Sequence, residues 1–92
     1  MPEVLEQSDT AEEVATVRPW NVILFNDTVH SFDEVIVQIQ KATGCNLERA
    51  TRITWTAHTE GQAVAFSGPF ERCEIVAAKL QEIQLRVSLI RS

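Results

Sequence analysis

The chain has 92 residues, 45% of them hydrophobic, which suits one small domain with a modest core. Its formal net charge of -5 disfavours binding to nucleic acid or to an anionic membrane surface. No segment approaches the roughly 18 apolar residues of a membrane span, and the acidic beginning is unlike a signal peptide. The 2 cysteines form no CxxC motif, so we expect reduced thiols and a cytoplasmic protein.

Residues 1–18, MPEVLEQSDTAEEVATVR, are rich in acidic side chains, hold few large apolar residues and contain no aromatic residue. This composition predicts a disordered acidic extension, followed by a folded domain over residues 19–92. From composition alone, the extension needs no role beyond solubility.

The first half of the folded domain predicts one strand and two helices. Residues 20–25 are rich in β-branched and aromatic side chains, which favours a strand. Ser31 followed by Glu34 is a capping-box signature, and the helix that it begins should end at Gly44. Asn46 is suited to cap a second helix, which should end at Gly61.

The second half predicts a strand, a helix and a strand. The strands are expected over residues 62–66 and 85–91, and the helix between them should have Pro69 at its first position. The order is therefore β-α-α-β-α-β. Because three strands need helices to bury their apolar face, we expect an α+β two-layer sandwich, a three-stranded antiparallel sheet packed against three helices.

The stretch FNDTVHSF, residues 25–32, carries more polar side chains than a turn requires. Asn26, Asp27 and neutral His58 each offer an acceptor, and three converging acceptors suit the three donors of an ammonium group. Phe32 and Val35 would then line an apolar pocket beside the amine. An alternative stays open at this point: an Asx-type turn after the strand, with His58 complementing a helix dipole.

The sequence gives little support for catalysis or for the binding of phosphate, RNA or zinc. The spacing gives no nucleophile with a base, no glycine-rich phosphate loop and no aromatic RNA-binding pattern. The histidines and cysteines lack zinc-ligand spacing. We therefore expect no enzyme, no metal and no cofactor.

Two ordered motifs, WNVILFNDTVHSFDEVI and LERATRITWTAHTEGQAV, resemble the ClpS family of adaptors of the ATP-dependent Clp protease. The resemblance extends from Trp20 to about Arg91. It implies that the protein binds substrates whose first residue is Leu, Phe, Tyr or Trp. It also implies delivery of these substrates to the N-domain of a Clp AAA+ unfoldase of the ClpA or ClpC type.

The family's functional positions carry over residue by residue. The resemblance implies an amine site, a side-chain pocket and an unfoldase-docking acid, and it implies that the acidic extension engages the unfoldase. The amine-site positions are Asn26, Asp27, Thr28 and His58; the pocket positions are His30, Phe32, Val35, Thr54 and Ala57; the docking acid is Glu71.

Three of these positions depart from the family pattern. Thr28 replaces a carboxylate, which removes at most about 1.5–3 kcal/mol of charge-assisted hydrogen bonding. Phe32 and Thr54 stand where methionine is common, and a phenyl ring adapts its shape less than methionine does. These changes leave open which first residue is preferred.

The leading hypothesis is thus a monomeric, non-enzymatic adaptor for proteins with a bulky hydrophobic N-terminal residue. The alternative, motivated by Thr28, is a Clp-docking regulator that does not recognise N-terminal residues. A third reading is a purely structural interaction domain, resembling the C-terminal domain of the ribosomal stalk protein. The His58 motif makes it the weaker fit.

Overall fold

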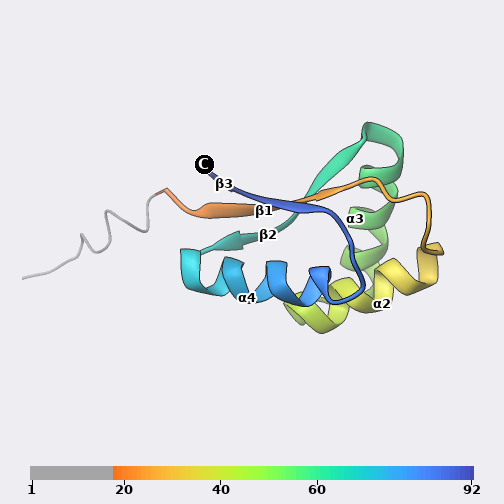
Figure 1. Ribbon diagram of the computed structural model, residues 1–92, viewed down its shortest axis with the longest axis horizontal. Helices are drawn as coiled ribbons and strands as arrows, with labels where there is room; N and C mark the ends of the chain where they lie inside the picture. Colours follow the sequence, from red (N-terminus) through yellow and green to blue (C-terminus); the bar gives the residue numbers. More distant parts are fainter. Residues whose placement is uncertain (1–17) are drawn as a thin grey trace, which may run out of the picture.

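The computed structural model describes residues 18–92, so the predicted extension lies outside the described residues except for Arg18. The element order is β-α-α-β-α-β, as predicted, and the α+β sandwich is confirmed (Figure 1). The elements are β1 (Trp20–Phe25), α2 (Phe32–Thr43), α3 (Leu47–Glu60), β2 (Gln62–Gly68), α4 (Phe70–Gln81) and β3 (Val87–Arg91).

The sheet is antiparallel and three-stranded in the order β2-β1-β3, so β1 is its central strand. The pairing of β1 with β2 begins at Trp20 opposite Gly68 and ends at Phe25 opposite Gln62, with a register shift between Val22 and Ile23. Because α3 leads directly into β2 through Gly61, this pairing brings the end of β1 beside the end of α3.

Local signals define both helices that flank the end of β1. At the start of α2, Ser31 Oγ accepts from Glu34 N at 3.2 Å, and Glu34 Oε1 accepts from Ser31 N at 2.8 Å. Asn46 Oδ1 accepts from Arg49 N at 2.8 Å, which caps α3. Both predicted caps are confirmed. Gly61 ends α3 with a φ of 92°, a left-handed conformation that favours glycine.

The core lies between the sheet and the helices. Val22 and Leu24 of β1 are almost fully buried, as are Ile39 of α2 and Leu80 of α4. Helix α4 contacts all three strands and α2, and Figure 1 shows α2 and α4 together beneath the sheet. Gln38 and Thr54 are buried polar residues. Gln38 donates through Nε2 to the carbonyl of Lys79 at 2.6 Å, which connects α2 to α4.

Three element boundaries differ from the prediction. β2 continues to Gly68 because Ser67 and Gly68 pair with β1. Pro69 is the N-cap of α4, not its first residue, because its ψ of 152° is extended. β3 begins at Val87, since Leu85 is buried in the loop and its N–H bonds to the carbonyl of Leu80 at 3.3 Å.

Within residues 18–92, no helix is both long enough and apolar enough to cross a membrane.

Candidate functional site

A narrow cavity opens where β1 ends, between α2 and α3. Its volume is about 20 Å³, enough for a water molecule but far below the roughly 150 Å³ that holds a benzene ring. The lining combines apolar and polar side chains: Leu24, Phe25, Asn26, Asp27, His30, Phe32, Val35, Thr54, Ala57, His58 and Leu85. Polar groups at one end of an apolar cavity can orient a ligand that has a polar and an apolar part.

Main-chain hydrogen bonds join the end of β1 to the end of α3, which carries His58. Asn26 N donates to the carbonyl of Gly61 at 3.0 Å. Gly61 N in turn donates to the carbonyl of Ala57 at 2.9 Å, within the last turn of α3 that carries His58. The backbone therefore fixes the position of Asn26 relative to the end of α3.

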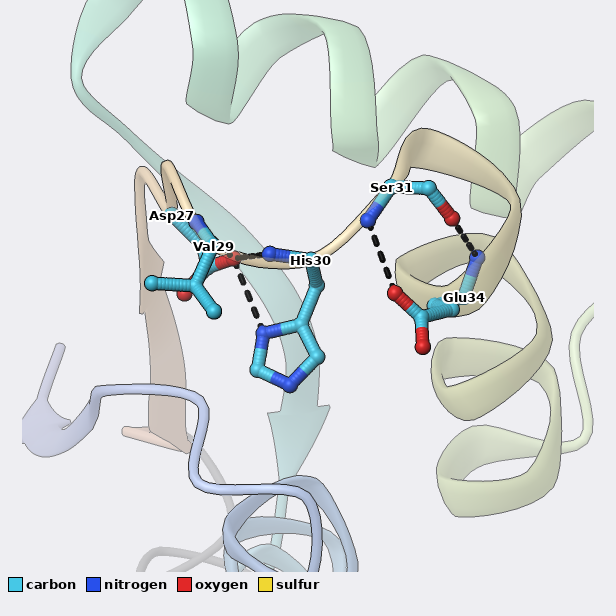
Figure 2. Close-up of polar contacts among 5 residues, drawn as sticks. All are labelled: Asp27, Val29, His30, Ser31 and Glu34. Carbon is cyan, nitrogen blue, oxygen red and sulfur yellow. Dashed lines mark hydrogen bonds and ion pairs between the residues drawn. The ribbon is translucent and has the colours of Figure 1, made fainter.

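Asp27 organises the loop between β1 and α2. Its Oδ2 accepts from Val29 N at 3.0 Å, from His30 N at 2.5 Å and from His30 Nδ1 at 2.9 Å (Figure 2). This is the Asx-type turn that the sequence left open. Within residues 18–92, Oδ1 receives no hydrogen bond, so one carboxylate oxygen is available to a ligand.

The hydrogen bond from His30 fixes the tautomer of its imidazole ring. A carboxylate only accepts, so Nδ1 carries the proton that it shares with Asp27. In the neutral ring, Nε2 is then an acceptor. His30 thus adds an acceptor to the cavity lining when it is uncharged.

The same contacts stabilise the charged form of Asp27. Burial desolvates the carboxylate and raises its pKa, but the hydrogen bonds and charge of His30 and the Val29 N–H outweigh this cost. The pKa of Asp27 therefore lies below the ordinary value of 3.8. Asp27 is an anion at neutral pH, which suits it to bind a cation.

This pKa shift predicts an acid-sensitive part of the stability. Because the folded-state pKa is depressed, Asp27 stabilises the fold fully above the unfolded-state value of 3.8, and this contribution disappears as pH falls through the lower folded-state pKa. Urea unfolding of the wild type and of Asp27→Asn should show a stability difference that is constant above about pH 5 and shrinks in more acidic solution. A difference independent of pH would contradict this role for the carboxylate.

Three aromatic rings pack together at the rim of the cavity. The ring centroid of Phe32 lies 4.8 Å from Trp55 and 5.2 Å from His58, and both pairs are edge-to-face. Trp55 and His58, three residues apart on α3, have ring centroids 5.9 Å apart. We call Phe32, Trp55 and His58 the aromatic cluster.

Comparison with known proteins identifies the family of this chain. The family model described as "ATP-dependent Clp protease adaptor protein ClpS" matches residues 15–88. The chain belongs to the ClpS family. ClpS proteins are adaptors of the Clp protease, as the family's description states.

Individual relatives agree with the family match. The ClpS adapter of Mycobacterium marinum is 33% identical over 79 residues, which cover 86% of this chain and 78% of that protein. The ClpS adapter of Rhodococcus opacus is 32% identical over 92 residues, which cover 98% of this chain and 82% of that protein. Among solved structures, Agrobacterium tumefaciens ClpS2 bound to L-phenylalaninamide superposes with a TM-score of 0.75 at 20% identity, covering 82% of this chain and 98% of that one. This last match supports the ClpS fold.

Most of the positions implied by the ClpS resemblance lie around the one cavity. Asn26, Asp27 and His58 line it together with all five predicted pocket positions. Thr28 is exposed and does not line it. Thr54 is buried, and its hydroxyl donates to the carbonyl of Ala50 at 2.8 Å, so its proton is not free for a ligand.

Sequence reasoning missed four residues of this region. Leu24, Phe25 and Leu85 line the cavity, and Trp55 packs against its rim. The three-residue spacing from Trp55 to His58 was a usable signal, since such residues are neighbours on a helix surface. Leu85 gave no such signal, because its position depends on the loop after α4.

Glu71 lies elsewhere, as an exposed residue in the first turn of α4. A larger cavity of about 270 Å³ is found at this end of the sheet, next to Trp20 and Phe70. Trp20 begins β1, whereas the small cavity adjoins its end, so the two cavities are separated by the length of the strand.

No cluster of three or more His, Cys, Asp or Glu side chains suited to a metal ion is present in the described part of the chain.

Proposed function

We propose that this ClpS-family adaptor binds proteins through a bulky hydrophobic N-terminal residue and delivers them to a Clp AAA+ unfoldase for degradation. The observation that carries the proposal is the convergence of Asn26, Asp27 and His58 on one cavity with an apolar lining. The proposed activity is binding, not catalysis. The two free cysteines, Cys45 and Cys73, fit a cytoplasmic location.

The polar end suits a free α-amino group. An ammonium group has three donors and a positive charge, and Asp27 offers an ionised carboxylate with a free oxygen. Asn26 and neutral His58 offer uncharged acceptors. Thr28 lies outside the cavity lining, so we propose that the amine is bound without it.

The apolar lining suits the side chain of the same residue. Leu24, Val35 and Ala57 are buried in the core and lie next to the amine end. The Agrobacterium relative was solved with L-phenylalaninamide, a compound that joins a free amine to a phenyl side chain. That chemistry matches the two ends of the cavity in this chain.

We propose that the unfoldase docks at the other end of the sheet, around Glu71. Its neighbour Phe70 is 41% exposed and packs edge-to-face on Trp20 with a centroid distance of 4.8 Å. An exposed aromatic ring beside a carboxylate suits a partner surface that carries both an apolar patch and a basic residue. Docking there would leave the peptide cavity free.

The test is a titration of peptides that begin with Leu, Phe, Tyr or Trp, each with a free or an acetylated N-terminus. Acetylation removes the positive charge and two donors, so we expect it to weaken binding at least tenfold. Equal affinity of the free and acetylated peptides would overturn the amine site.

The small cavity volume and the neutral Thr28 favour a second candidate function. In it, the protein is a regulator that docks on the Clp unfoldase and does not recognise N-terminal residues. The same titration distinguishes the two. A protein that captures the unfoldase N-domain in a pull-down but binds none of the peptides would be such a regulator.

A further inference from the structure

The cavity cannot accept a bulky side chain in its present shape. It measures about 20 Å³, far below the roughly 150 Å³ of a cavity that is known to bind benzene. If the proposed function holds, a lining residue must move when the ligand enters.

Phe32 is better placed to move than the lining residues that belong to the core. Leu24, Val35 and Ala57 are at most 6% exposed and belong to the packed core. Phe32, in contrast, is half-buried and is the first residue of α2, where it follows the loop. Displacing its ring disturbs the core less than displacing any of those three.

The ring of Phe32 is held by the aromatic cluster. Trp55 packs on it edge-to-face at 4.8 Å, although Trp55 does not line the cavity and is itself 53% exposed. Edge-to-face pairs are favourable beyond the area they bury. Trp55 also contacts His58, but at the longer centroid distance of 5.9 Å.

We propose that Trp55 is a positioning residue that holds Phe32 over the cavity and thereby sets the affinity for bulky N-terminal residues. The inference rests on the proposed function. A protein that binds only when open has an apparent affinity reduced by the fraction of open molecules. Loss of the Trp55 contact raises that fraction.

The experiment compares wild type with Trp55→Ala in binding a peptide that begins with Phe. We expect about two- to tenfold tighter binding by the variant, the range that one aromatic pair supports. The gain should appear in the association rate, because the open fraction limits encounter, while the dissociation rate stays the same. Trp55→Phe, which keeps an aromatic edge, should return the affinity toward the wild-type value.

Two controls make the assignment specific. Leu47→Ala removes another exposed apolar side chain of α3, 60% exposed, and should leave binding unchanged. In a Phe32→Ala background, Trp55→Ala should have no further effect, since the residue through which it acts is gone. This double-mutant cycle also separates the proposed role from a general loss of stability.

Unchanged or weaker binding by Trp55→Ala, or a gain that lies in the dissociation rate, would overturn the inference. Failure of the proposed function would give a different result in the peptide titration, because acetylated and free peptides would then bind every variant equally.

Discussion

The Asp27→Asn variant should bind peptides with a free bulky N-terminal residue about ten- to a hundredfold more weakly than the wild type. The substitution keeps the size of the side chain and removes its charge. A hydrogen bond to a charged group is worth about 1.5–3 kcal/mol, which corresponds to this range in affinity. Isothermal titration with a peptide that begins with Phe or Leu measures the change.

The matched control is Asp33→Asn, an exposed carboxylate in the first turn of α2 that does not line the cavity. It makes the same change in net charge and should leave peptide affinity within about twofold, since exposed charges interact weakly through water. Equal losses for both variants would mean that the overall negative charge, and not Asp27 itself, attracts the amine. Peptide binding by Asp27→Asn at the wild-type level would contradict the proposed role of Asp27.

The Leu80→Ala variant should lower the free energy of unfolding by about 2–5 kcal/mol. Leu80 is 0% exposed, on the helix that contacts all three strands and α2, so its loss leaves a cavity between the layers. A domain of this size has about 5–15 kcal/mol of stability in total, so the variant loses a large share. Urea unfolding should show a lower midpoint with an unchanged slope.

Ile75→Ala on the same helix provides the comparison. Ile75 is 54% exposed, and its truncation should change stability by no more than about 0.5 kcal/mol. A cost for Leu80→Ala as small as that of Ile75→Ala would mean that α4 is not packed on the sheet as described.

The fold was predictable from sequence because its signals are local. Ser31 with Glu34, Asn46 and Gly61 each fix a helix end through contacts within a few residues. The missed boundaries depend on distant partners: Gly68 belongs to β2 only because it pairs with Trp20. A proline fixes φ but not ψ, so the sequence could not distinguish the N-cap from the first helical position at Pro69.

The candidate site was predictable in part. The motif resemblance brought Asn26, Asp27 and His58 together, although they lie on segments about 30 residues apart, a separation over which periodicity carries no information. For Asp27 the sequence left two interpretations open, an amine site and an Asx-type turn, and it did not decide between them. The small volume of the cavity was not predictable, because it depends on how side chains from β1, α2 and α3 pack in three dimensions.

The hydrogen bond from Asn26 N to the carbonyl of Gly61 orders the backbone at the amine end of the cavity before any ligand binds. Ordering a free backbone residue costs about 1–2 kcal/mol, and at the amine end this entropy is already lost when the chain folds. An incoming amine would meet a backbone that is already ordered at Asn26, and its contribution would be the same for every ligand. Under the inference that Phe32 moves when the ligand enters, the reorganisation cost would fall on Phe32 and would depend on the size of the incoming side chain. Discrimination among N-terminal residues would therefore arise at the deformable end, while the rigid end supplies affinity common to all.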